Sequence, residues 1–413
     1  MRAGDAVTPD AVARNRAFVE RLNRPLTERG ERTAVSLFSG ILGIEIALGR
    51  LGFSTRYAID LDPVAKAVKD ANARHLGTFP YVAGDLRSVE PQEILEVAGL
   101  EPGELTILTG GPPCQPFSKS GGRSGVLDER GRLFARYLDY LDVLRPQAFV
   151  LENVRGMVSS RGGADFRLIL DAFDESGYTL YWKVVDAANY GVPQFRQRLF
   201  LVGFRERIRF AFPRETHGSD EDTEQTLFSD VQPFVTAGDA IRDLAGVVAP
   251  PPYSGQFAHL LSAIPPGLNY SYYTAERGHP QPIFGWRSKY WYFLLKGHPE
   301  RPSLTVQAQP GNNTGPFHWD GRRFAVEELR RLQSFPDWLS LDVPYYVAHR
   351  LIGNAVPPLL AEAIGASVAD ALDGRELISK TDYLAARAAA TLRVRSGSGA
   401  GKGKAKLDAP LAA

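Results

Sequence analysis

The sequence predicts an α/β fold class built on a doubly wound, mostly parallel sheet. Short apolar runs with strand character alternate with helical patterns through the first 200 residues, as in successive β–α units. Between residues 33 and 50 a strand, a glycine turn and a helix follow one another, which is how dinucleotide-binding folds begin. Small or acidic residues come directly after each of the first three predicted strands. Because open α/β sheets bind ligands at the carboxyl ends of their strands, these residues predict a site at that edge.

The composition is that of an ordinary soluble globular protein. With 413 residues, 44% of them hydrophobic and 23% charged, the chain has room for two domains and a large core. Its net charge of +1 means that nucleic-acid binding would depend on local basic patches. No apolar run reaches about 18 residues, and residues 1–15 lack a signal-peptide core, so we expect a cytoplasmic protein with no membrane contact. The single cysteine excludes an internal disulfide and a multi-cysteine metal site.

The first half of the predicted sheet has the features of a nucleoside site. A helix over residues 10–22 precedes the first strand, and helices over 44–50 and 63–73 follow the first two. The acidic residue after the second strand stands about 20 residues beyond the glycine turn, which suits a group that binds ribose hydroxyls. A glycine turn with one distant aspartate is weak evidence, but three successive strand ends describe a site for an adenosine-like ligand. The strands are residues 33–38, 57–59 and 81–83, and the residues after them are Gly40, Gly43, Asp60 and Asp85.

A fourth predicted strand, residues 105–109, runs into a stiff loop that carries the only cysteine. Cys114 follows Pro112 and Pro113 and precedes Pro116, and each proline has a fixed φ. A lone cysteine is usually a small buried hydrophobic residue. Packing a core does not require three prolines around a thiol, so the sequence favours a functional thiol at the carboxyl end of a strand.

The next stretch holds a candidate acid. Residues 118–132 are rich in glycine and basic residues and form either a mobile lid or a solvated loop. A helix over residues 133–144 leads to a buried strand over 148–151, which ends in Glu152. This glutamate is either solvated or has a raised pKa that lets it donate a proton.

A second polar group precedes the strand at residues 199–202. It follows a helix over 166–176 and a strand over 181–185. Gln194, Arg196 and Arg198 alternate, so at strand spacing their side chains would share one face. That face is either a solvated edge or a site for an anion or a carbonyl group.

The composition changes near Phe204. Residues 215–230 hold six acidic residues and no lysine or arginine, as expected of a solvated linker. Residues 270–301 interleave aromatic with basic side chains, which predicts either a nucleic-acid surface or a small core with a charged exterior. Helices then continue to about residue 372, and the chain after residue 396 is low in complexity.

These motifs, in this order, resemble the cytosine-5 DNA methyltransferase family over residues 33–372. The combination of the Pro-Cys-Gln block with the Gln-x-Arg-x-Arg block is highly specific. Three positions depart from the family pattern, namely Ser36 for an acidic residue, Leu42 for a glycine and Asp60 for a glutamate. The matching blocks are Leu37–Gly40, Asp60–Asp62, Gly84–Asp85, Pro112–Ser118, Glu152–Val154, Gln194–Arg198, Arg331–Asp337 and Gly353–Pro357.

The resemblance implies a Rossmann-like, S-adenosylmethionine-dependent methyltransferase domain. It implies that Phe38 lies near the adenine, that Asp60 binds the ribose and that Asp85 binds the adenine amine. It also implies that Gly40 and Gly43 let the cofactor approach the backbone. Pro112 and Asn354 complete the implied cofactor site.

The same resemblance implies covalent catalysis with no metal. Cys114 would supply a thiolate that adds to C6 of cytosine, so that C5 can attack the methyl group. Glu152 would hold and protonate N3, Arg196 would bind O2, and Arg198 belongs to the same catalytic group. Because the target lies inside the duplex stack, the base must be flipped out. The implied DNA contacts are Gln115, Ser118, Arg123, Gln194, Arg287 and Lys289.

The resemblance also implies a two-domain organisation, with a smaller target-recognition domain between the two parts of the methyltransferase domain. We expect a monomer that acts on double-stranded DNA, with a cognate restriction endonuclease as a further candidate partner. Methylation of RNA, a non-catalytic DNA-binding relative and a nicotinamide oxidoreductase are the alternatives. The implied segments are an N-terminal extension (1–30), the catalytic domain (31–203), the recognition domain (204–322), a return segment (323–378) and a C-terminal extension with a disordered tail (379–413).

Overall fold

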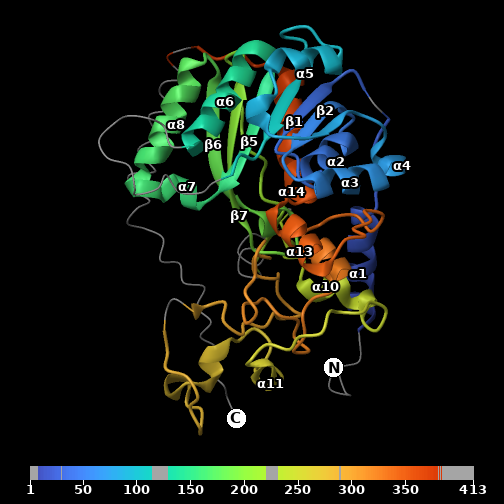
Figure 1. The fold of residues 1–413 in the computed structure, drawn as a ribbon, viewed down its shortest axis with the longest axis vertical. Helices are drawn as coiled ribbons and strands as arrows, with labels where there is room; N and C mark the ends of the chain where they lie inside the picture. Colours follow the sequence, from blue (N-terminus) through green and yellow to red (C-terminus); the bar gives the residue numbers. More distant parts are fainter. Residues whose placement is uncertain are drawn as a thin grey trace.

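A seven-stranded sheet forms the centre of the molecule (Figure 1). The structure is a computed structural model that describes residues 8–28, 30–113, 129–219, 231–287, 290–379, 381 and 383. The strand order is β3-β2-β1-β4-β5-β7-β6. The strands are β1 Thr33–Leu37, β2 Ser54–Asp60, β3 Tyr81–Ala83, β4 Ile107–Gly110, β5 Ala148–Val154, β6 Thr179–Asp186 and β7 Gln197–Phe204.

The order of the strands places a switch point between β1 and β4. The chain moves outward from β1 through β2 to β3, then crosses back to β4 and β5 on the other side. These five strands are parallel, whereas β7 pairs antiparallel with both β5 and β6. The predicted doubly wound fold is therefore confirmed, and its ligand-binding edge is where β1 and β4 end.

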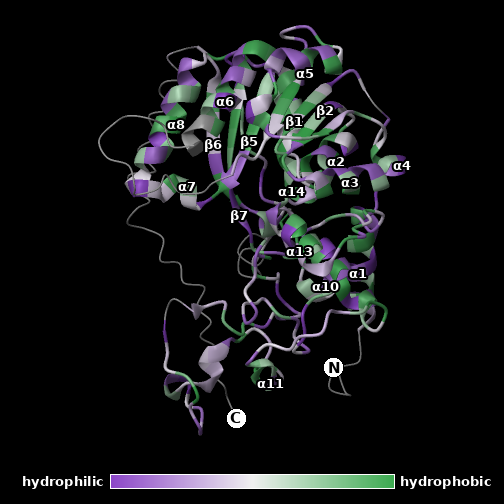
Figure 2. Ribbon diagram, viewed as in Figure 1, coloured by the Kyte–Doolittle hydropathy of each residue, from purple (hydrophilic) through white to green (hydrophobic). Residues whose placement is uncertain are grey.

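Helices cover both faces of the sheet, and Figure 2 shows the hydrophobic strands between them. Alternate strand residues enter two separate cores, since Ala34 packs with α2 and α14 whereas Val35 packs with α5, α6 and α8. The helices beside the sheet are α2 Gly43–Arg50, α3 Pro63–Ala71, α4 Ala73–Leu76, α5 Pro91–Ala98, α6 Glu129–Leu144, α7 Gly156–Ser159, α8 Ala164–Glu175 and α14 Pro358–Gly374.

Several predicted elements differ at their ends. The predicted helix over 63–73 breaks at Asn72, whose side chain accepts from Ser340 N and donates to Ser340 O. Strand β5 is longer than predicted, so Glu152 lies inside it. Strand β7 begins only at Gln197, so Gln194 and Arg196 precede the strand and do not alternate along it.

The end of the described chain packs against the start of the sheet. Helix α14 lies against α2, which follows β1. The remaining helices are α1 Pro9–Leu22, α10 Ala237–Ile241, α11 Ala258–Leu261, α12 Val326–Leu332 and α13 Tyr345–Asn354. The predicted segment boundaries stay predictions.

The region predicted to recognise the target has little regular structure. Its described residues form a pair of two-residue strands, β8 His217–Gly218 and β9 Gln232–Pro233, and a few short helices. They also form a separate small hydrophobic core that includes Leu261, Tyr270 and Phe317. This region lies below the sheet in Figure 1, in yellow and orange.

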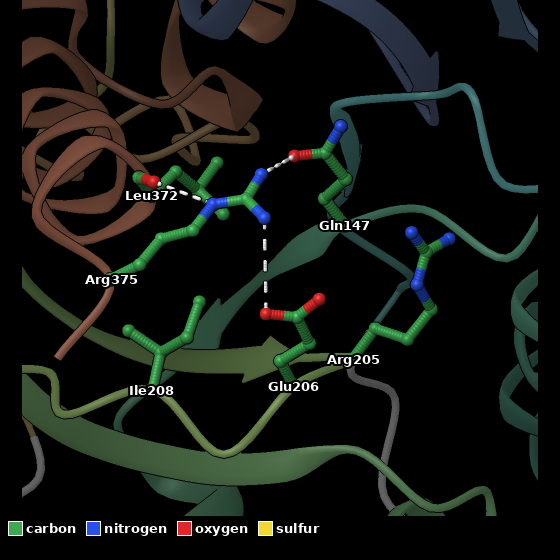
Figure 3. Close-up of a pocket in the computed structure, with 6 residues that line it drawn as sticks. All are labelled: Gln147, Arg205, Glu206, Ile208, Leu372 and Arg375. Carbon is green, nitrogen blue, oxygen red and sulfur yellow. Dashed lines mark hydrogen bonds and ion pairs between the residues drawn. The ribbon is translucent and has the colours of Figure 1, made fainter. Parts of the chain in front are cut away.

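A small cavity lies at the edge of the sheet opposite the switch point (Figure 3). It encloses about 70 Å³ beside Gln147, which precedes β5, and Arg205, which follows β7. Arg375 donates to Gln147 Oε1 at 3.2 Å and lies 3.9 Å from Glu206 Oε2. This volume holds a few water molecules and no nucleoside.

One helical stretch in the described part of the chain, Tyr345–Gly374, is long and apolar enough to cross a membrane. It comprises α13 and α14, and 72% of its apolar window is buried inside the protein. Core helices of globular proteins have the same properties, so the stretch is weak evidence for a membrane span.

Candidate active site

The turn after β1 is held in an unusual backbone conformation. Phe38, Gly40 and Leu42 have φ values of 58°, 52° and 69°, a region that non-glycine residues rarely adopt. The carboxylate of Asp60 accepts a hydrogen bond from Gly40 N at 2.8 Å, and Tyr81 Oη donates to Gly40 O at 2.8 Å. The turn after β1 is thus bound to the end of β2 and to the first residue of β3.

The two glycines of the turn have different reasons to be glycine. A Cβ added at Gly40 would meet no atom of the described residues within 4 Å, so this backbone borders open space among them. A Cβ added at Gly43 would lie 2.1 Å from Val356 O, in the segment before α14. The close approach of Val356 is by itself a reason for glycine at position 43, and the contact of Gly43 with a cofactor stays a prediction.

The carboxylates of Asp60 and Asp85, at the ends of β2 and β3, both have partners within the chain. Burial raises the pKa of Asp60 despite the hydrogen bonds from Asp62 N and Gly40 N. Asp85 forms an ion pair with Arg87 at 2.6 Å, and this contact lowers the pKa of Asp85. Leu61, which we did not single out from the sequence, is 70% exposed beside Asp60. An apolar residue between two aspartates at a strand end was the signal for it.

Helix α13 closes this edge from the other side. Arg350 in α13 forms an ion pair with Asp62 at 2.7 Å, and Asp62 caps α3 by accepting from Val64 N at 3.0 Å. Asn354, the predicted cofactor residue at the end of α13, is exposed. The return of the chain from the recognition region is thereby tied to the predicted cofactor site.

A buried carboxyl group that we did not predict lies at the start of α2. Glu45 is 4% exposed, and neither of its carboxylate oxygens has a hydrogen-bond partner among the described residues. Burial raises the pKa of Glu45 to about 7, against the opposing influence of the hydroxyls of Ser36 and Ser39. An acidic residue among the apolar residues 41–48 was the sequence signal for a buried carboxyl group.

The loop after β4 starts next to Glu152. An added Cβ at Gly111 would lie 3.3 Å from Glu152 Oε2, and the buried Asn153 donates to Pro112 O at 2.9 Å. Asn153 is a positioning residue that we did not single out. The predicted nucleophile and three predicted DNA contacts, Cys114, Gln115, Ser118 and Arg123, lie outside the described residues.

Glu152 has a single ion-pair partner in the described part of the chain. Arg198 Nε lies 2.8 Å from Glu152 Oε1, across the antiparallel pair β5–β7. Their side chains are 12% and 13% exposed, so both are largely removed from water. Burial raises the pKa of Glu152, and the guanidinium groups of Arg198 and Arg196 oppose this shift.

Arg196 is bound within the chain. It is 1% exposed, and its guanidinium donates to Val306 O at 3.2 Å, Gly353 O at 2.6 Å and Ala355 O at 3.1 Å. These contacts join the start of β7 to the recognition region and to the end of α13. The bond from Arg196 to a base stays a prediction.

Gln194 is also bound within the chain. It is fully buried, and its amide donates to Leu332 O at 3.1 Å and to Gln333 Oε1 at 2.6 Å. Its carbonyl oxygen accepts from Val306 N at 3.0 Å. Gln194 thus connects distant chain segments, and its contact with DNA stays a prediction.

The aromatic residues of the recognition region divide into two groups. Tyr270 and Tyr273 are buried in its small core. Trp286, Tyr290 and Trp291 are 59%, 50% and 46% exposed. A small core is therefore present, whereas a nucleic-acid surface on the exposed residues stays a prediction. The exposed Arg287 lies 6.0 Å from the centre of the Tyr290 ring, whereas Lys289 lies outside the described residues.

The sheet order, the turn after β1 and the acidic strand ends define a Rossmann-like α/β fold. Residues 33–370 match the family described as C-5 cytosine-specific DNA methylase. The match covers most of the chain, and the protein therefore belongs to that family and is a DNA (cytosine-5-)-methyltransferase.

Known proteins agree with this assignment. The type II methyltransferase M.SacI of Streptomyces achromogenes is 36% identical over 361 residues, covering 81% of this chain and 92% of that protein. M.AquIA of Picosynechococcus is 38% identical over 53% of this chain and 92% of that protein. A prophage-encoded E. coli protein, assigned as a DNA modification methyltransferase, shares the fold with a TM-score of 0.59 at 19% identity. That alignment covers 83% of this chain and 99% of the E. coli chain.

Proposed function

We propose that this methyltransferase transfers the methyl group of S-adenosylmethionine to C5 of a cytosine that is flipped out of duplex DNA. In this proposal the Cys114 thiolate adds to C6 of the base, and Glu152 and Arg198 hold its polar edge. The observation that carries the proposal is the buried Glu152–Arg198 pair, which lies beside the first residues of the loop that bears Cys114.

The residues at the edge of the sheet fit S-adenosylmethionine. The open space next to Gly40 admits a ligand close to the backbone. Asp60 and Asp85 offer acceptors for ribose hydroxyls and for the adenine amine, and the exposed Leu61 and the half-buried Phe38 offer apolar surface for a purine. Asn354 at the end of α13 completes the proposed cofactor site. When bound, the sulfonium group supplies an electrophilic methyl group.

Each protein group has a defined part in the proposed reaction. C5 of cytosine is a poor nucleophile, so the Sγ–C6 bond must form first, and Glu152 donates a proton to N3 as it forms. Arg198 then binds the pyrimidine oxygen beside Glu152. After C5 has received the methyl group, a water molecule accepts the C5 proton, and the electron pair of that bond forms the C5–C6 double bond. The thiolate of Cys114 then leaves C6, and N3 returns its proton to Glu152. The raised pKa of Glu152 supports its part, because burial favours the protonated carboxyl group that donates to N3.

The substrate in this proposal is a specific sequence in double-stranded DNA. The target atoms lie inside the stack, so the base must leave the helix to reach Cys114. The exposed Arg287 and the neighbouring exposed aromatic residues supply cationic and apolar contacts to the duplex. Because the relatives are named type II methyltransferases, we propose a cognate restriction endonuclease as a partner in the same system. A monomeric, cytoplasmic protein stays a prediction.

The test is covalent trapping on DNA that contains 5-fluorocytosine. Fluorine cannot leave C5 as a proton does, so the enzyme with labelled cofactor should form an adduct that survives a denaturing gel. Cys114→Ala should abolish the adduct and turnover and should retain DNA binding. Transfer of label only to tRNA would favour the RNA alternative. Retained methylation by Cys114→Ala would refute the nucleophile, and thermal stabilisation by NAD alone would refute the cofactor.

A further inference from the structure

The N-terminal segment, residues 8–28, precedes the part of the chain that matches the family, and we call it the strap. Its helix α1 packs against α10 at the start of the recognition region and buries Ala11, Phe18 and Leu22. Asn15 in this helix is 7% exposed. Its amide donates to Asp239 O at 2.9 Å and to Asp243 Oδ1 at 2.8 Å. The strap thus binds the recognition region through a buried polar group.

A second asparagine of the strap binds the return segment. Asn23 caps the end of α1. Its amide donates to Asp337 Oδ2 at 3.0 Å, and its carbonyl oxygen accepts from Asp337 N at 2.8 Å. Asp337 lies after the end of α12 and about 100 residues beyond Asp239, so the strap binds two segments that are distant in the sequence.

Arg331 joins the carboxylates of Asp243 and Asp337. Arg331 in α12 is 5% exposed, and it donates to Asp337 through Nε at 2.8 Å and through Nη2 at 2.9 Å. Its Nη1 donates to Asp243. Each asparagine of the strap therefore holds one of the two carboxylates that neutralise Arg331. Burial works to raise the pKa of Asp337, but hydrogen bonds from Arg331 and Asn23 leave it below its usual value.

The strap is also fixed to the catalytic sheet. Arg24 forms an ion pair with Glu362 of α14 at 2.8 Å, and Thr27 N donates to Gly49 O, at the end of α2, at 3.1 Å. The return segment also contacts the residues before β7. Leu332, at the end of α12, and Gln333, which follows it, accept hydrogen bonds from Gln194, two residues before Arg196. The contacts of the strap thus extend from the back of the sheet to the residues behind the candidate active site.

We propose that the strap sets the position of the recognition region relative to the catalytic sheet, with Asn15 and Asn23 as positioning residues for DNA binding. Neither side chain contacts DNA in this proposal. They act through Asp243, Asp337 and Arg331, which fix the two segments that enter and leave the recognition region. A displacement of about 1 Å between reading surface and reacting base is enough to reduce productive binding strongly.

The first test compares Asn15→Ala and Asn23→Ala with Arg16→Ala. Arg16 lies on the same helix with its side chain 81% exposed and serves as the matched control. Each asparagine variant should raise the Kd and the KM for duplex DNA about tenfold, because a buried charged group loses a donor. The Kd for S-adenosylmethionine should not change, and Arg16→Ala should stay within about twofold for both ligands. A lower unfolding midpoint with unchanged DNA affinity would overturn the proposal and leave the strap a purely stabilising element.

The second test exchanges donor and acceptor. Asn15→Asp places a third carboxylate against Asp239 and Asp243, so its loss of DNA affinity should exceed that of Asn15→Ala. Adding Asp243→Asn keeps an acceptor for Arg331 and restores a donor for the new carboxylate, so the double variant should recover affinity. A double variant as weak as Asn15→Asp would contradict the proposal. DNA affinity is measured here by equilibrium binding, so a failure of the Cys114 mechanism would leave this outcome unaffected.

Discussion

The carboxyl edge of the sheet and the recognition region position their functional side chains in different ways. At the sheet edge, parallel strands end together, and hydrogen bonds such as Gly40 N to Asp60 join one strand end to the next. In the recognition region a small aromatic core takes the place of a ladder of strands. In the proposed function, the chemistry therefore depends on a regular scaffold of strands, whereas the recognition of the target depends on local side-chain packing.

The largest effect should come from Arg198→Ala at the sheet edge. This change removes the partner of Glu152 and, in the proposed mechanism, a donor aimed at the pyrimidine oxygen. Loss of one such donor in a buried site typically reduces turnover by about 10²- to 10³-fold. We expect that loss in kcat with little change in unfolding midpoint, because Glu152 can take up a proton when its cation is removed. Steady-state kinetics and urea unfolding check both parts.

Arg196→Ala is the matched comparison for Arg198→Ala. It removes the donors to Val306 O, Gly353 O and Ala355 O, and each buried carbonyl left without a partner costs about 1 to 3 kcal/mol. Its unfolding midpoint should therefore fall clearly below that of Arg198→Ala. Equal midpoints for the two variants would show that the contacts of Arg196 do not hold the segments together.

The sheet edge and Arg196 differ in how far the sequence could predict them. The placement of Gly40 and Asp60 at this edge could be predicted, because apolar runs mark strands and parallel strands end at one edge. Glu152 was also expected on its strand, which continues two residues beyond it. The role of Arg196 could not be predicted, because its partners follow it by 110, 157 and 159 residues. No local pattern contains such contacts. The recognition region was predictable only as a mixture of core and surface, since its aromatic residues follow no period.

The second effect concerns Glu45, the buried carboxyl group beneath the turn after β1. Its pKa is about 7 in the folded protein against 4.5 for an unperturbed glutamate. The folded state therefore binds its proton more tightly, and the stability that this provides is present below pH 4.5 and is lost as the pH rises to about 7. The expected loss is roughly 3 kcal/mol.

Glu45→Gln should remove this dependence. Urea unfolding at pH 5 and pH 8 should show a smaller fall in the free energy of unfolding for Glu45→Gln than for the original protein. The other buried acids, Asp60 among them, are present in both proteins and cancel in the difference. An equal fall in the free energy of unfolding for the two proteins would show that Glu45 does not titrate between pH 5 and pH 8. Its ionised carboxylate would then cause no loss of stability at this edge of the sheet.

The smallest effect should come from Trp286→Ala in the recognition region, which can be compared with Tyr273→Ala in the core of the same region. Trp286 is 59% exposed, so its removal should leave the unfolding midpoint unchanged and weaken DNA binding by tenfold or less. Tyr273 is 5% exposed and donates to Leu260 O at 2.8 Å, so Tyr273→Ala should cost about 3 kcal/mol of stability. Calorimetry and DNA titration on both variants separate the two roles. If Trp286→Ala lowered stability as much as Tyr273→Ala, the exposed aromatic residues would belong to the scaffold, and the contrast between reading surface and core would not hold.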